Sequence, residues 1–149
     1  MPAEIFVDTN VLLCAYDHSV KEKQRKAIEI LDALIHTGTG VLSTQVLAEF
    51  FQVITRKISP PLSKGDAYER IVNLVRSWKV LDVTGLIVLE AARAAAEHNL
   101  SFWDAQIWAT CKLNQVPTIL TEDVPIPYLE GIRYVNPFDP DFRLQEWVL

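Results

Sequence analysis

The chain has 149 residues, 50% of them hydrophobic and 22% charged, with five glycines and eight prolines. This composition excludes a disordered or collagen-like protein, and we expect a single domain over residues 1–149 with an irregular tail from about residue 136. Fourteen basic and nineteen acidic residues give a net charge of −5, so the molecule as a whole should repel nucleic acid. The most apolar long stretch, residues 80–96, is interrupted by Asp82, Glu90 and Arg93, which excludes a membrane-spanning helix there.

The N-terminus, the cysteines and the basic residues bear on the cellular compartment and on RNA binding. The N-terminus lacks the basic start and long apolar run of a secretory signal, so we expect a cytoplasmic protein. Cys14 and Cys111 stand singly without Cys-x-x-Cys spacing, as reduced core thiols do. Residues 21–64 hold seven basic and four acidic side chains. Lys23 and Arg25 are therefore candidates for RNA binding, although a solvated helix face is the plainer interpretation.

In chain order, short apolar runs rich in β-formers alternate with amphipathic helical patterns. Strands are predicted at residues 4–7, 41–42, 80–83, 118–120 and 132–135. Helices are predicted at residues 11–14, 21–35, from 44 to the prolines at 60 and 61, 63–78, 86–98 and 101–114. The strands are too short and apolar to face water, so we predict a three-layer α/β/α sandwich with a central parallel sheet. In such sheets the functional crevice lies beyond the carboxyl ends of the strands.

Four acidic residues fall where such a crevice is expected. Asp8 and Asp123 follow the first and fourth predicted strands. Asp104 shares the core-facing stripe of its helix with Ile107, and Glu49 lies at the border of an apolar helix face. Each acid also has a purely structural explanation. Asp8 and Asp104 could cap helices, Asp123 could open a turn, and Glu49 could be ordinary surface.

Gathering these carboxylates requires a cation. Two carboxylates about 4 Å apart repel by roughly 4 kcal/mol at an effective dielectric constant of about 20. All-oxygen ligands suit Mg²⁺ or Mn²⁺, whereas zinc would normally recruit histidines or cysteines, which are scattered in this chain. A bound divalent ion acidifies a water molecule and polarises a phosphoryl oxygen. The four acids therefore predict metal-dependent phosphodiester hydrolysis without a nucleophilic side chain.

Five segments carry a family resemblance. They are residues 6–13, 43–49, 100–105, 120–123 and 135–138. In order and spacing they resemble PIN-domain endoribonucleases, the VapC-like toxins of type II toxin–antitoxin systems. The resemblance implies that four acids form the metal site and that two polar residues support the ligands or contact phosphate. The acids are Asp8, Glu49, Asp104 and Asp123, and the polar residues are Asn10 and Thr121.

The resemblance also implies an activity and partners. The activity is magnesium-dependent cleavage of single-stranded RNA, with Mn²⁺ as the alternative ion, and a cognate antitoxin protein would neutralise it. We also expect a homodimer. One departure is the stiff proline-containing stretch at residues 124–128, which leaves Glu122 as an alternative to Asp123 in the metal site.

Other protein classes fit less well. A haloacid-dehalogenase-like phosphatase would also place Asp8 after the first strand, but it needs an aspartate at the position of Asn10 as its general acid. The remaining alternative is a non-catalytic PIN-fold module that binds RNA or a protein. The presence of all four acids argues against it.

Overall fold

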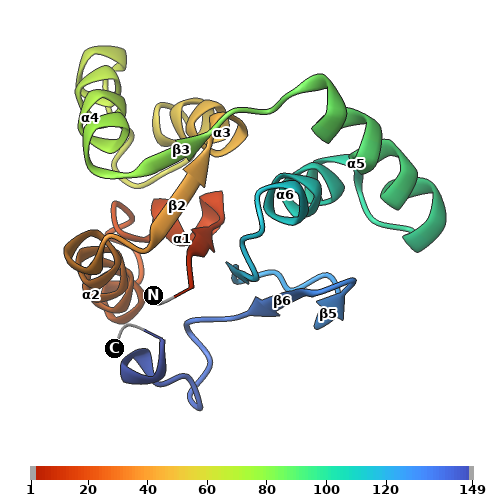
Figure 1. Ribbon diagram of the computed structural model, residues 1–149. Helices are drawn as coiled ribbons and strands as arrows, with labels where there is room; N and C mark the ends of the chain where they lie inside the picture. Colours follow the sequence, from red (N-terminus) through yellow and green to blue (C-terminus); the bar gives the residue numbers. More distant parts are fainter. Residues whose placement is uncertain (1–2, 148–149) are drawn as a thin grey trace.

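A six-stranded sheet in the order β3-β2-β1-β4-β6-β5 forms the centre of the computed structural model, which describes residues 3–147 (Figure 1). The strands are β1 (Ile5–Val7), β2 (Gly40–Ser43), β3 (Lys79–Leu81), β4 (Thr118–Leu120), β5 (Tyr128–Leu129) and β6 (Ile132–Val135). The helices are α1 (Thr9–Cys14), α2 (Lys21–Thr37), α3 (Thr44–Ile54), α4 (Lys64–Ser77), α5 (Gly85–His98) and α6 (Phe102–Leu113), followed by the short 3-10 helix η1 (Leu144–Glu146).

Helices flank the sheet, as the alternating sequence pattern predicts. The helix α5 packs along α6, which contacts β4 and β6, whereas α2 and α3 contact β2 (Figure 1). The α/β sandwich class is therefore confirmed. No helix within residues 3–147 has both the length and the apolar character needed to cross a membrane.

The sheet differs from the prediction in two places, because β3 is Lys79–Leu81 instead of residues 80–83 and β5 was not predicted. The pairs β1–β2, β1–β4, β2–β3 and β4–β6 are parallel, but β5 runs antiparallel to β6. Glu130 and Gly131, between these two strands, both have positive φ, at 44° and 90°. Two successive residues of this kind form a tight hairpin that reverses the chain, so β5 must be antiparallel. The sheet is thus mostly rather than wholly parallel.

Most helices also differ from the prediction by one or two residues at their ends, and α3 by more. The helix α1 begins at Thr9 instead of residue 11, because the Asp8 side chain accepts a hydrogen bond from the Thr9 N–H and caps the helix earlier in the chain. The helix α3 ends at Ile54, well before the prolines, and the Ile54 carbonyl accepts from the Leu62 N–H. The residues between Ile54 and Leu62 therefore form a loop that returns to the end of α3.

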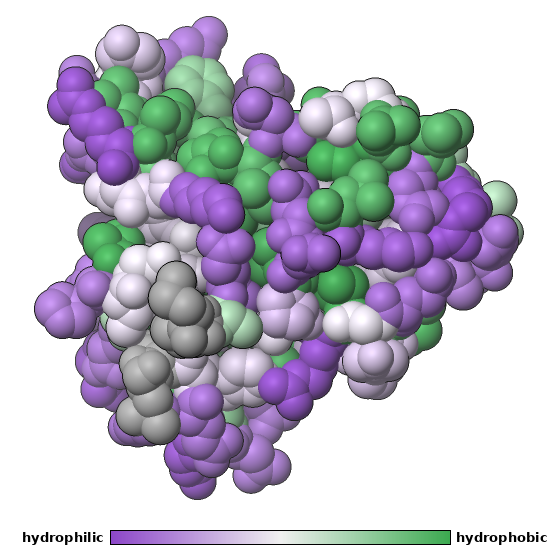
Figure 2. All heavy atoms as spheres, viewed as in Figure 1, coloured by the Kyte–Doolittle hydropathy of each residue, from purple (hydrophilic) through white to green (hydrophobic). Residues whose placement is uncertain are grey.

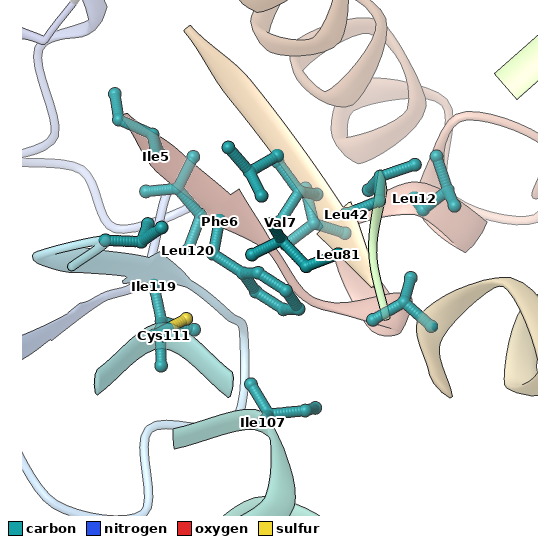
Figure 3. Packing of buried hydrophobic residues seen from close by; sticks show 14 of the residues in the cluster. Ile5, Phe6, Val7, Leu12, Leu42, Leu81, Ile107, Cys111, Ile119 and Leu120 are labelled. Carbon is teal, nitrogen blue, oxygen red and sulfur yellow. The ribbon is translucent and has the colours of Figure 1, made fainter. Parts of the chain in front are cut away.

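Part of the hydrophobic core lies between β1, β4 and α6, and the core continues onto the helices α1, α2 and α3. Figure 3 shows Phe6 of β1 beside Ile119 of β4, with Ile107 and Cys111 of α6 facing them. Trp108 is fully buried, and its indole N–H donates to the Leu129 carbonyl (3.1 Å). Both cysteines are free thiols, and burial raises the pKa of the Cys111 thiol. Cys111 is thus a core residue as expected, whereas Cys14 is only partly buried.

The strand order places a switch point beside β1. The chain leaves β1 toward β2 and β3 on one side and returns to β4 on the other. Connections that diverge in this way leave a crevice at the carboxyl ends of the two central strands. There the Asp8 N–H donates to the Leu120 carbonyl (2.9 Å), which fixes the end of β1 against the end of β4.

Candidate active site

A hollow of about 270 Å³ lies at the switch point, and we call it the acid hollow. Its lining comprises Asp8, Thr9, Asn10, Leu13, Gln45, Glu49, Val53, Trp103, Asp104, Ile107 and Asp123. The four predicted acids therefore meet in one cavity, although they come from four separate segments of the chain. No lysine, arginine or histidine is among these lining residues. The hollow thus has a strongly negative lining.

Asp8 is partly buried at the end of β1, and both of its carboxylate oxygens are held. Oδ1 accepts from the Thr9 N–H (2.7 Å), and Oδ2 accepts from the Thr121 hydroxyl (2.9 Å). Removal from water raises the pKa of Asp8 to about 6. The hydrogen bonds from Thr121 and Thr9 oppose this shift, while the charges of Glu49 and Asp104 add to it. Asp8 is thus both the cap of α1 and a carboxylate that a nearby cation would stabilise.

Thr121 and Asn10 form the support beneath Asp8. The buried Thr121 hydroxyl accepts from Asn10 Nδ2 (3.0 Å) and from the Asp123 N–H (3.3 Å). Both lone pairs of the Thr121 hydroxyl oxygen therefore accept hydrogen bonds, and the hydroxyl proton is donated to Asp8. Asn10 Oδ1 accepts from the Glu122 N–H (3.1 Å). Together the two side chains fix the loop after β4 to the start of α1.

Glu49 is oriented by residues that sequence analysis missed. Glu49 Oε1 accepts from Gln45 Nε2 (2.7 Å), and Oε2 accepts from the Thr9 hydroxyl (3.4 Å). The buried Gln45 also donates to the Trp103 carbonyl (3.1 Å) and accepts from Gln106 (2.9 Å). These amides join α3 to the start of α6. The available signal was the spacing, because Gln45 precedes Glu49 by four residues and shares its helix face.

Asp104 lies in the first turn of α6 and is half-buried. The cap of this helix is Ser101, whose hydroxyl accepts from the Asp104 N–H (3.1 Å). The carboxylate of Asp104 lines the acid hollow beside Ile107. Capping and a place in the hollow are thus compatible, because Ser101 supplies the cap.

The loop after β4 separates Asp123 from Glu122. Asp123 is exposed and lines the acid hollow. The carboxylate of Glu122 instead forms an ion pair with Lys23 of α2, whose ammonium lies 5.5 Å from the centre of the Phe138 ring. Arg25 is directed to its own helix, where it pairs with Glu22 (2.6 Å) and, more loosely, Glu29. Of the two predicted RNA contacts, Lys23 thus pairs with the residue next to Asp123, whereas Arg25 pairs within α2.

The donor set of the acid hollow can be compared with the needs of a metal. Within residues 3–147, no three Asp, Glu, His or Cys side chains converge as they would around a bound ion. The hollow nevertheless offers four carboxylates and no cysteine or histidine. Hard oxygen donors of this kind suit Mg²⁺ or Mn²⁺ and not zinc. The repulsion among Asp8, Glu49 and Asp104 would also be relieved by a cation.

A larger groove adjoins the acid hollow. It has a volume of about 640 Å³ and shares Gln45, Glu49, Val53 and Trp103 with the hollow. Its other lining residues are Thr44, Ala48, Gln52, Val83 and Gln106, and we call it the apolar groove. Hydrophobic residues also gather nearby over α5 (Figure 2), where Leu86 and Leu89 are about 70% exposed.

Comparisons with known proteins agree with this architecture. The chain is similar in structure to VapC20 of Mycobacterium tuberculosis, described as a sarcin-ricin loop cleaving toxin, with 18% identity, a TM-score of 0.64, and coverage of 87% of this chain and 99% of that one. It is also similar to DNA-bound VapBC of Salmonella typhimurium, with 16% identity, a TM-score of 0.67, and coverage of 91% and 98%.

A toxin–antitoxin complex of Klebsiella pneumoniae matches with 19% identity, a TM-score of 0.66, and coverage of 91% and 98%. No curated protein sequence matches the chain. The sequence profile of the PIN domain matches residues 5–127, which is most of the chain. The resemblance inferred from the five segments is thereby confirmed, and the chain belongs to the PIN domain family.

Proposed function

We propose that this PIN domain is a metal-dependent endoribonuclease that hydrolyses phosphodiester bonds of single-stranded RNA. The observation that carries the proposal is the acid hollow, where Asp8, Glu49, Asp104 and Asp123 meet at the switch point of the sheet. Membership of the PIN family supports the nuclease class. The alternative, a non-catalytic binding module, has no need for four carboxylates at a mutual electrostatic cost.

The four acids would hold Mg²⁺ or Mn²⁺. When bound, the ion supplies an acidified water molecule and stabilises the charge that develops on the phosphoryl and leaving oxygens. Thr121 and the Thr9 N–H hold Asp8 in place, and Gln45 holds Glu49. Preorganised carboxylates keep their geometry without reorganisation during the reaction, which is the main contribution of this chain to catalysis.

RNA binding is proposed for Lys23. Its ammonium lies beside the loop that carries Asp123. A phosphate entering the acid hollow would therefore pass close enough to be attracted by the positive charge of Lys23. Arg25, the second basic candidate, has no such support, since its guanidinium pairs with acids of its own helix. Single-stranded RNA is the favoured substrate because a phosphate of an extended strand can reach the hollow without duplex geometry.

We also propose that the chain is the toxin of a toxin–antitoxin pair. The solved structures that resemble it include toxin–antitoxin complexes. The apolar groove offers a surface for an apolar antitoxin segment, and such a segment would lie against Glu49 and Trp103 and cover the acid hollow. Two free thiols are consistent with a reducing cytoplasm. The homodimer stays a prediction that light scattering can test.

The test is an RNA cleavage assay. Purified protein is incubated with structured and unstructured RNAs in Mg²⁺, in Mn²⁺ and in chelator. We expect cleavage of unstructured RNA only with metal, and a loss of at least about a hundredfold in Asp8→Asn and Asp104→Asn. RNA binding without cleavage in any metal would favour the non-catalytic module instead. Unchanged cleavage by both variants would remove the acid hollow from the mechanism.

A further inference from the structure

The ion pair between Lys23 and Glu122 connects two distant parts of the chain. Lys23 lies on α2, and Glu122 lies in the loop that follows β4. The Lys23 side chain is 39% exposed and that of Glu122 is 28% exposed, so solvent reaches both. Partly exposed pairs of this kind are weak and easily exchanged, because water and salt screen the charges.

The pair stands at the rim of the acid hollow. Asn10 lines the hollow, and its Oδ1 accepts from the Glu122 N–H (3.1 Å). Asp123, the next residue after Glu122, lines the hollow as well. The ring of Phe138 holds the Lys23 ammonium from another side, 5.5 Å from its centre. Backbone and aromatic contacts therefore fix where the two charged groups meet.

The lining of the acid hollow contains only negative charges among its ionised groups. An RNA strand entering it would be repelled along its whole length except where a metal ion or a rim cation compensates. Lys23 can provide that compensation, but in the free protein its ammonium is already neutralised by Glu122. A carboxylate and a phosphate offer the same kind of anionic oxygen to an ammonium group.

We propose that Glu122 occupies, in the free protein, the place where an RNA phosphate next to the cleaved bond binds Lys23. RNA must then displace Glu122 from Lys23 before it is fully bound. Glu122 acts as an internal competitor that weakens the binding of RNA, and Lys23 is the group that both anions share. This inference rests on the proposed ribonuclease function and assigns a part of its substrate-binding surface.

The chain offers a matched control for the removal of Glu122. Glu22 pairs with Arg25 on the same helix that carries Lys23, and both partners of that pair are more than 60% exposed. Glu22→Gln and Glu122→Gln each remove one negative charge and the nearest ion-pair partner of one cation on α2, although Arg25 keeps its looser pair with Glu29. They differ in whether the freed cation lies at the rim of the acid hollow. The Glu122 N–H bond to Asn10 uses the backbone, so the substitution leaves it in place.

The experiment measures binding of a fluorescent unstructured RNA by anisotropy, in chelator so that the RNA stays intact, over a range of salt concentrations. We expect Glu122→Gln to bind roughly two- to fivefold more tightly than wild type. The gain should be largest at low salt and shrink as the salt concentration rises, because salt screens the competing Lys23–Glu122 pair of wild type, whereas the number of phosphate contacts is the same in both complexes. Glu22→Gln should match wild type, and adding Lys23→Gln to Glu122→Gln should abolish the gain.

Two results would overturn the proposal. One is an equal gain for Glu122→Gln and Glu22→Gln, which would mean that only net charge matters. The other is a Glu122→Gln variant that binds like wild type, checked with Glu122→Ala in the same assay. Wild-type RNA cleavage with Mg²⁺ is measured in parallel. Wild-type cleavage together with either result refutes only the role of Glu122, whereas a wild type that neither binds nor cuts RNA refutes the proposed function itself.

Discussion

Replacing Asp8 with asparagine should stabilise the metal-free protein at neutral pH. Burial raises the pKa of Asp8 from 3.8 to about 6. A difference of about two pKa units between the folded and unfolded chains corresponds to about 3 kcal/mol of lost folding free energy once the carboxylate is ionised. The asparagine side chain carries no charge, so this penalty disappears in the variant. Asparagine caps a helix as well as aspartate does, so the bond from the Thr9 N–H is retained.

One hydrogen bond opposes this gain. The Thr121 hydroxyl donates to Asp8 Oδ2, and its lone pairs are occupied by Asn10 and the Asp123 N–H. An amide nitrogen at the position of Oδ2 cannot accept that proton, which costs about 1 kcal/mol. The net stabilisation is therefore about 2 kcal/mol at pH 7. For a chain of this length that corresponds to a rise in Tm of roughly 4–8 °C.

The pH dependence has a definite sign. Because the folded chain holds the Asp8 proton more tightly than the unfolded chain, the wild type loses stability as the pH rises from about 4 to about 6. The advantage of Asp8→Asn should thus be full above pH 7 and turn into a small deficit at about pH 4 and below, where the cost of the lost hydrogen bond exceeds the remaining charge penalty. Thermal unfolding followed by circular dichroism in chelator, from pH 4 to pH 8, measures this directly.

The control for this prediction is Asp32→Asn, an exposed position on α2 that should leave the Tm unchanged. Adding Mn²⁺ should stabilise the wild type by about 2.7 kcal/mol at a hundredfold excess over Kd, and Asp8→Asn by much less. An Asp8→Asn variant that is less stable than wild type at every pH would refute the reasoning. Asp8 would then be a helix cap with an ordinary carboxyl group.

The same contacts lead to four further expectations. Asp104→Asn should stay folded, because Ser101 caps α6, but lose its stabilisation by Mn²⁺; a Tm shift with Mn²⁺ equal to that of wild type would contradict this. Lys23→Glu should weaken RNA binding and reduce the slope of log affinity against log salt by at least about 0.7, whereas Arg25→Glu should do neither. Equal effects of the two substitutions would mean that both residues belong to an ordinary solvated helix face. Trp108→Phe should cost about 2 kcal/mol in chemical unfolding, since it leaves the Leu129 carbonyl without its donor, while RNA cleavage is retained; a neutral substitution would exclude a stabilising role of this bond. Ala48→Glu, in the apolar groove, should prevent co-purification of the co-expressed antitoxin but leave RNA cleavage intact, and undiminished co-purification would move the antitoxin site elsewhere.

Much of the fold could be predicted from local patterns. The apolar run Ile5–Val7 is buried throughout, as a central strand with helices on both faces requires. By contrast, β5 has only two residues, and its pairing depends on the positive φ of Glu130 and Gly131. Periodicity was also misleading within α2. Ile28 and Ile35 fit the apolar stripe but are each 42% exposed, because the side that the sheet covers is set by tertiary packing.

The candidate site shows the same division. The rule for parallel sheets was enough to bring Asp8 and Asp123 to one edge. The contact of Gln45 with Gln106 joins two helices, and the pairing of Lys23 with Glu122 joins α2 to the loop after β4. Neither contact can be predicted from the pattern of neighbouring residues in the sequence. Residues on one element or at strand ends were therefore predictable, and those held by contacts between elements were not.

The acid hollow is proposed to bind a divalent metal ion. Titration of the protein with Mn²⁺, with free Mn²⁺ followed by electron paramagnetic resonance, tests this without reference to RNA. We expect saturable binding by wild type and by Asp32→Asn, and a loss of binding in Asp104→Asn, because Asp104 contributes one of the four carboxylates. Equal Mn²⁺ binding by all three proteins, or no binding by wild type, would contradict the account.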